Sequence, residues 1–189
     1  MRAFLALELP DEIRREIEAL ERELARTLSD WRWIRPEALH LTLRFLGEIE
    51  ERAELEARAV WAAAAGSVPP FRLRVRGLGC FPGVERPRVL WIGVEEADRQ
   101  GRLLGLVDAL ERAARAAGFP PERRCFEPHL SLARAARGAR PRGPASSAAA
   151  LAGTIPVRQV VLFESKLEST GARYTARARF PLGDATGRS

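Results

Sequence analysis

Apolar residues recur along the chain with two different periods, which predict alternating strands and helices. A run of apolar residues over 2–8 predicts a buried strand. A helix is predicted from Asp11, which can cap its first turn, to about Leu28. Residues 39–47 then predict a second strand. The apolar stripe of the helix follows helical spacing and consists of Ile13, Ile17, Leu20, Leu24 and Leu28.

The same order of elements recurs further along the chain. Residues 88–94 predict a strand, residues 98–117 a helix, and residues 125–134 another strand. The spacing between the elements nearly matches that of the first segment. This recurrence suggests that one structural unit has been duplicated.

The remaining segments complete the expected fold. Residues 137–144 are dense in Gly, Pro and Arg and predict a loop. The other expected elements are a helix over 50–65, a strand over 71–77, a short Ala-rich helix over 145–152, and a hairpin of 157–167 and 172–180 around Ser169, Thr170 and Gly171. Together they predict an α+β fold in which residues 1–189 form one domain of two lobes with mainly antiparallel sheets.

Composition fits an ordinary globular protein but narrows the function only slightly. Of the 189 residues, 46% are hydrophobic and 30% are charged, and no stretch approaches membrane-spanning length, so the cytoplasm is the expected compartment. The net charge of +6 comes almost wholly from arginine, since Lys166 is the only lysine. Arginine matches phosphate geometry and favours an anionic partner such as RNA. GC-rich coding or a hot habitat would give the same composition.

Cysteine and histidine usage argues against a metal site. Cys80 and Cys125 have no CxxC spacing, and the two histidines have no clustered cysteine or carboxylate. We therefore expect reduced cysteines, no metal and no cofactor.

The two histidines of the chain open nearly identical words, HLTL at 40–43 and HLSL at 129–132. In a strand, residues two apart point the same way, so His40 would share a face with Thr42, and His129 with Ser131. A single His-x-Thr is more often structural than catalytic. The second copy favours one site built from two halves, because an imidazole can transfer protons at neutral pH and a hydroxyl can stabilise a developing negative charge.

These paired words resemble the two-histidine (2H) phosphoesterase superfamily. HLTLRFLGE at 40–48, FEPHLSLAR at 126–134 and VLFESKL at 161–167 resemble in particular its bacterial and archaeal RNA 2',3'-cyclic phosphodiesterases, historically called 2'-5' RNA ligases. The resemblance implies a pseudo-twofold fold with a central cleft, in which each lobe supplies one histidine strand. It also implies a monomer that hydrolyses 2',3'-cyclic phosphate ends of RNA, such as those of tRNA fragments, to 2'-phosphates without a metal.

The resemblance also implies a role for each motif residue. His40 would donate a proton to the departing 3'-oxygen, and His129 would accept one from the attacking water. Thr42 and Ser131 would hold the non-bridging oxygens, although threonine is commoner than serine at the second position. Serine keeps the hydroxyl but loosens its rotamer. Arg134 matches an arginine of the extended second motif and would clamp a phosphate.

Further residues are weaker candidates for binding substrate. Strict alternation puts Arg44 on the face of His40, and Phe45 on the leucine face and so in the core. Phe126 and Tyr174 could stack on a base, although core packing is the commoner role for such residues. Arg32 and Arg35 could line an RNA path, but surface arginines usually only contact solvent.

Several rival functions share these features. The same site could run in reverse as an ATP-independent 2'-5' RNA ligase, with a 5'-hydroxyl in place of water. It could also act on another substrate of the superfamily, such as ADP-ribose cyclic phosphate or 2',5'-oligoadenylate. A non-catalytic RNA-binding module is the least compatible with the retention of both histidines and both hydroxyls.

Overall fold

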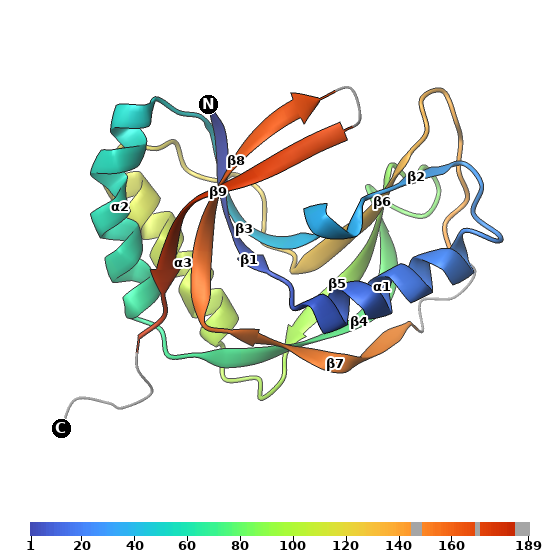
Figure 1. Ribbon diagram of the computed structural model, residues 1–189, viewed down its shortest axis with the longest axis horizontal. Helices are drawn as coiled ribbons and strands as arrows, with labels where there is room; N and C mark the ends of the chain where they lie inside the picture. Colours follow the sequence, from blue (N-terminus) through green and yellow to red (C-terminus); the bar gives the residue numbers. More distant parts are fainter. Residues whose placement is uncertain (145–148, 169–170, 184–189) are drawn as a thin grey trace.

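Two antiparallel sheets with helices packed outside them form the architecture of the computed structural model, which describes residues 1–144, 149–168 and 171–183 (Figure 1). Sheet A has the order β3-β1-β8-β9 and comprises His40–Glu48, Arg2–Glu8, Gln159–Glu168 and Gly171–Pro181. Sheet B has the order β2-β6-β5-β4-β7 and comprises Trp31–Trp33, His129–Ala135, Val89–Glu96, Phe71–Phe81 and Ala150–Val157. The helices in this part of the chain are α1 (Asp11–Leu24), α2 (Glu51–Gly66) and α3 (Arg102–Ala116), with a 3-10 turn, η1, over Pro36–Ala38.

The two sheets repeat one arrangement. In sheet A the unit β1-α1-β3 places β3 beside β1, and in sheet B the unit β5-α3-β6 places β6 beside β5. Strands β8 and β9 then extend sheet A just as β4 and β7 extend sheet B. This confirms the predicted α+β fold with two repeated halves. Strand β2 breaks the symmetry, because it comes from the first half and pairs with β6 of the second.

Each long connecting helix packs under the opposite sheet. Helix α1 follows β1 of sheet A but lies along β7 of sheet B, whereas α3 follows β5 of sheet B and packs against β3 of sheet A (Figure 1). Helix α2 lies beside α3 and contacts β9. This exchange ties the halves together, because neither sheet is covered only by its own helix.

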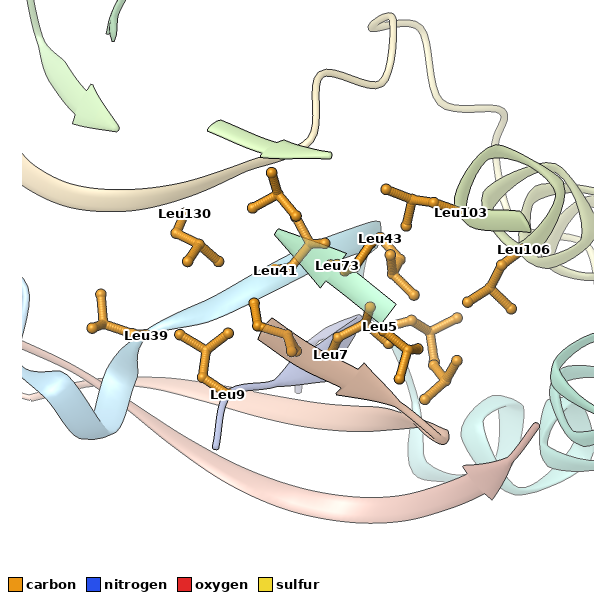
Figure 2. Packing of buried hydrophobic residues seen from close by; sticks show 14 of the residues in the cluster. Leu5, Leu7, Leu9, Leu39, Leu41, Leu43, Leu73, Leu103, Leu106 and Leu130 are labelled. Atoms are coloured by element: carbon orange, nitrogen blue, oxygen red, sulfur yellow. The ribbon is translucent and has the colours of Figure 1, made fainter. Parts of the chain in front are cut away.

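The leucines of the His-x words face this shared core, as alternation predicts. Figure 2 shows leucines of β1, β3, β4, β6 and α3 packed together. Leu41 and Leu130, which follow the two histidines, are both fully buried. Burying a leucine stabilises the fold by roughly 1.5–3 kcal/mol, so the two histidine strands are firmly held.

The prediction of an Ala-rich helix over 145–152 was wrong where the structure tests it. Ala150–Val157 forms strand β7 on the edge of β4, and residues 145–148 lie outside the described chain. The carboxylate of Glu16 on α1 accepts hydrogen bonds from the backbone N–H groups of Ala152 (2.8 Å) and Gly153 (3.1 Å). Tertiary pairing thus overrides the helix propensity of alanine.

The remaining elements were predicted with shifted ends. Helix α1 ends before Leu28, which is nevertheless buried, and α3 begins at Arg102 rather than at 98. Pro10, not Asp11, occupies the N-cap of α1. The predicted hairpin is formed by β8 and β9, with Ser169 and Thr170 outside the described residues.

Candidate active site

The two histidines begin equivalent strands of the two sheets, His40 in β3 and His129 in β6. These strands contact each other across the interface between the halves. Desolvation is the main cause that lowers the pKa of His40, and Arg134 and His129 lower it further, so the three side chains lie within electrostatic reach of one another. The fold therefore brings the two words, which lie far apart in sequence, to one interface.

Each imidazole is fixed by the same backbone contact. Nδ1 of His40 lies 2.8 Å from the carbonyl oxygen of Ala38, and Nδ1 of His129 lies 2.6 Å from that of Glu127. Because a carbonyl oxygen can only accept, each Nδ1 carries the proton in this contact. Nε2 is then the nitrogen left for chemistry in both rings.

Aromatic side chains hold both imidazoles in similar orientations. The ring of Tyr174 stands edge-on to His40 at 4.9 Å between centroids, and Phe81 stands edge-on to His129 at the same distance. Phe4 lies 4.7 Å from His40, and Trp91 lies 6.1 Å from His129. Backbone contact and ring packing together leave each imidazole little freedom to reorient.

A cavity opens beside each histidine. The one at His40, of about 260 Å³, is lined by Glu8, Arg14, Glu37, Ala38, Leu39, His40, Phe163, Tyr174 and Ala176. The one at His129, of about 320 Å³, is lined by Arg76, Phe81, Trp91, Gly93, Val94, Glu95, Phe126, Glu127, Pro128 and His129. The predicted stacking candidates Tyr174 and Phe126 thus line one cavity each.

A β-bulge in each histidine strand changes which face the later side chains occupy. The β1–β3 register passes from Ala6 opposite Thr42 to Leu5 opposite Arg44, so Leu43 is an extra residue. In β6 the pairing with β5 likewise skips Leu132. In both strands the fourth and fifth residues are buried in succession and the sixth is exposed.

The bulge overturns the prediction that Arg44 shares the face of His40. Arg44 is only 6% exposed, and its guanidinium lies 2.5 Å from the carboxylate of Glu111 on α3. It also donates to the carbonyl oxygens of Phe45 and Pro120. Strict alternation failed here because the extra residue turns Arg44 into the protein, where it ties β3 to the segment that leads to His129.

The same extra residue returns the sixth residue of each strand to the face that carries the histidine. Phe45, predicted to lie in the core, is 48% exposed and contacts Phe4, which itself packs against His40. Arg134 occupies the equivalent position in β6 and is also exposed. The bulge therefore explains how an arginine five residues after His129 can act on the same site.

The two hydroxyl residues lie two positions after the histidines, on the histidine face. Thr42 and Ser131 are both partly exposed, between buried leucines. Within the described part of the chain neither hydroxyl makes a hydrogen bond. Both can therefore bind the oxygens of a ligand. Arg32 and Arg35 are exposed.

Burial and nearby cations suppress protonation of His40. Desolvation is the main cause and lowers the pKa of His40 to about 4, with further lowering by Arg134, His129 and Arg14. The hydrogen bond to Ala38 raises the pKa but does not compensate. Without an anion in the site, His40 is therefore neutral at pH 7.

Sequence reasoning missed the rings and the cation that complete the site. Arg14 of α1 donates hydrogen bonds to the carbonyl oxygens of Leu9 (3.0 Å) and Pro36 (3.2 Å), which holds the turn before His40. Trp91 lies opposite Gly79, where a Cβ atom would come within 2.2 Å of the indole. The pairing of Gly79 with Trp91 leaves room for this cavity wall, and no local pattern in the sequence indicates it.

Comparison with known proteins identifies the family of this two-histidine site. The sequence profile of the family described as LigT like Phosphoesterase matches residues 7–91 and 93–174, and each matched segment contains one of the two histidines. The chain belongs to the LigT-like phosphoesterase family. The confirmed resemblance thus extends over most of the chain.

Curated relatives of this LigT-like phosphoesterase carry one common name, RNA 2',3'-cyclic phosphodiesterase. The Thermus thermophilus protein is 35% identical over 195 aligned positions, which cover 100% of this chain and 93% of the relative. The Aquifex aeolicus protein is 31% identical, with 97% and 98% covered. The Geobacillus stearothermophilus protein is 32% identical over 95% of this chain, which spans only 56% of that relative.

Solved structures agree with this assignment. The Thermus thermophilus protein TT0787 superposes on this LigT-like phosphoesterase with a TM-score of 0.83 at 31% identity, over 98% of this chain and 100% of that one. Escherichia coli LigT in its apo form gives a TM-score of 0.74 at 28% identity, over 97% and 98%.

The described residues contain neither a candidate metal cluster nor a membrane-spanning helix. Among them no three or more His, Cys, Asp or Glu side chains converge in a way that could hold a metal ion. No helix in the described ranges has the length and apolar character needed to cross a membrane.

Proposed function

We propose that the protein hydrolyses 2',3'-cyclic phosphate ends of RNA and leaves a 2'-phosphate. The observation that carries this proposal is the pair of backbone-fixed histidines, one from each half, which share one electrostatic environment. The name of the curated relatives supports the same substrate, and crystals of Escherichia coli LigT have held 3'-AMP and phosphate.

In the proposed reaction a water molecule attacks the phosphorus atom while the bond from phosphorus to the 3'-oxygen breaks. Nε2 of His129 accepts the proton of the water, and Nε2 of His40 donates a proton to the departing 3'-oxygen. Each transfer accelerates the reaction by roughly 10²- to 10⁴-fold. The transferred protons leave the two histidines in exchanged states, which solvent then resets.

His40 can donate only if it is protonated, and its low pKa in the free protein sets a condition on the mechanism. The cyclic phosphate carries one negative charge, which would offset the charges of Arg134 and Arg14 and favour the imidazolium form. We propose that His40 takes up its proton together with the substrate. A donor of this kind remains neutral until an anion arrives.

The remaining residues would bind the phosphate and the nucleoside. The hydroxyls of Thr42 and Ser131 would donate to the non-bridging oxygens, and Arg134 would neutralise the phosphate charge. Tyr174, in the cavity on the His40 side, would contact the terminal nucleoside, because the departing 3'-oxygen belongs to that ribose. Phe126 lines the cavity on the His129 side, where the water would attack.

A second activity, 2'-5' RNA ligation, is favoured by the ring-lined cavity beside His129. Hydrolysis needs only a water molecule on that side of the phosphorus, whereas a cavity of about 320 Å³ has room for part of a nucleoside. A 5'-hydroxyl placed there could attack in place of water, with the same proton transfers.

Product analysis tests both activities. A 2',3'-cyclic mononucleotide and a short RNA with a cyclic phosphate end are incubated with the protein in the presence of a chelator. We expect 2'-phosphates from both, and a 2'-5' linkage when a 5'-hydroxyl RNA is added. Release of 3'-phosphates would contradict the proposed bond cleavage, and dependence on a metal would contradict the mechanism.

A further inference from the structure

Strand β2 brings one arginine of the first half into the second half. It pairs with β6 at the edge of sheet B, next to the strand that carries His129. Trp31 anchors it, because this side chain is buried and its indole N–H donates to the carbonyl oxygen of Arg142 at 3.0 Å. The N–H of Ile34 donates to the carbonyl oxygen of Leu132 at 2.8 Å and continues the pairing.

The register of this pairing sets Arg32 directly opposite Arg134. Opposed residues of antiparallel strands project from the same face, with Cβ atoms roughly 4.5–5.5 Å apart. Both arginines are exposed, while the neighbouring Ala133 is buried in the core. The arginines therefore project away from the core, on the face of β6 that carries His129.

No protein group neutralises this pair in the described part of the chain. Neither Arg32 nor Arg134 has an ion pair or a side-chain hydrogen bond there. Directly opposed like charges destabilise a sheet. An anion bound between or beside the two guanidinium groups would remove that repulsion.

The arginine pair lies beside the proposed catalytic groups. Arg134 is close enough to His40 for its charge to act on the imidazole. One arginine is sufficient to neutralise the single negative charge of a cyclic phosphate. The second has a use when the substrate carries a further phosphate, as every RNA chain longer than one nucleotide does.

We propose that Arg32 binds the first phosphodiester on the 5' side of the terminal nucleotide, while Arg134 binds the cyclic phosphate. This inference rests on the proposed function and deepens it. Arg32 makes the site prefer an RNA chain over a free cyclic mononucleotide. The strand that crosses between the halves thus supplies substrate selectivity.

The test compares two substrates in Arg32→Gln, Arg32→Lys and Arg112→Gln. The substrates are a 2',3'-cyclic mononucleotide and a tetranucleotide with the same terminal base and a cyclic phosphate. We expect the ratio of kcat/KM for the tetranucleotide to that for the mononucleotide to fall by about 10-fold in Arg32→Gln, through KM. Arg32→Lys should recover part of the ratio, and the control Arg112→Gln, at an exposed position of α3, should leave it unchanged.

Salt dependence gives a second readout that does not need turnover. The dissociation constant of a tetranucleotide ending in a 2'-phosphate is measured against salt concentration. Loss of one phosphate contact should reduce the slope of the log–log plot by about 0.7 in Arg32→Gln. The slope of Arg112→Gln should match that of the unchanged protein.

The outcomes separate the inference from the proposed function. If the unchanged protein turns over both substrates but Arg32→Gln keeps both its ratio and its slope, the arginine inference is overturned. If the protein turns over neither substrate, the proposed function fails, and the slope alone decides the inference. A reduced slope supports it, and an equal slope overturns it.

Discussion

The two histidine strands have the same construction up to their bulges and differ just beyond them. β3 and β6 both begin with a histidine, continue with a partly exposed hydroxyl, and then bury two residues in succession. The second buried residue is Arg44 in β3 but Ala133 in β6. The next, exposed residue is Phe45 in β3 but Arg134 in β6.

This difference shows that the duplicated unit has divided its tasks. In the first half the arginine enters the protein and holds the approach to His129, while an aromatic ring remains near His40. In the second half the arginine remains at the site and supplies positive charge. Because the bulge buries the fifth residue and exposes the sixth in both strands, the position of the arginine decides whether its charge serves the fold or the ligand.

The largest expected effect is the loss of either histidine. His40→Gln and His129→Gln should each lower kcat by about 10³-fold, because one proton transfer is lost in each variant. The double variant should be little worse than either single variant, since the two groups act as a unit. The measurement is steady-state hydrolysis of a 2',3'-cyclic mononucleotide.

The binding of product RNA to the same variants provides the control. A non-catalytic RNA-binding module would show no turnover and would lose affinity in both variants, whereas the enzyme should retain product binding within roughly 10-fold. If either single variant kept more than a tenth of its turnover, the two halves would not share one reaction.

Substitution of Arg44 should mainly lower stability, whereas substitution of Arg134 should mainly lower activity. Arg44→Met should lower the free energy of unfolding by about 3 kcal/mol, because it leaves the carboxylate of Glu111 without its partner. Arg134→Gln should change stability by less than about 0.5 kcal/mol. It should lower kcat/KM by roughly 10- to 100-fold, as expected for a charged hydrogen bond.

Urea unfolding and kinetics on the same preparations separate these outcomes, with the exposed Arg112→Met on α3 as the control. A stable but inactive Arg44→Met would return that residue to the site. Such a result would favour strict alternation of the β3 side chains, which places Arg44 on the face of His40.

The bulges mark the limit of what the sequence can predict here. The periods of 2 and 3.6 place the main strands and helices, and the repeated words indicate His40 and His129 as candidate site residues. An extra residue in β3 is visible only in its pairing with β1, so the facing of Arg44 and Phe45 could not be derived from one strand. The cavity wall of Phe81 and Trp91 comes from distant segments, which no local pattern links to His129.

The low pKa of His40 predicts an acid-dependent loss of stability. The folded protein holds the pKa of His40 at about 4, below the unfolded value of 6.5. The unfolded chain therefore binds the proton first, and the stabilisation present above pH 6.5 is lost as the pH falls toward 4. The loss should reach at most roughly 3 kcal/mol.

Urea unfolding at pH 7 and pH 4.5 measures this loss in the unchanged protein and in two variants. His40→Gln should lose less stability on acidification, whereas His129→Gln, which keeps His40, should retain the loss. Adding sulfate, whose charge is constant over this range, should reduce the loss, because an anion favours protonated His40. Equal acid sensitivity of all three proteins would remove the basis for proton uptake with substrate.

The smallest expected effect separates the two hydroxyls. Thr42→Val and Ser131→Ala each remove one hydrogen-bond donor, which should lower kcat by roughly 3- to 10-fold and leave stability within about 0.5 kcal/mol. KM should change little if each hydroxyl binds the phosphate oxygens more strongly in the transition state. The kcat of Ser131→Thr should stay within about threefold of that of the unchanged protein or exceed it, because β-branching restricts the rotamers of the side chain.

A Thr42→Val variant with full activity would mean that only the second half supplies a hydroxyl. The two strands would then differ from their third residue onward rather than from their fifth.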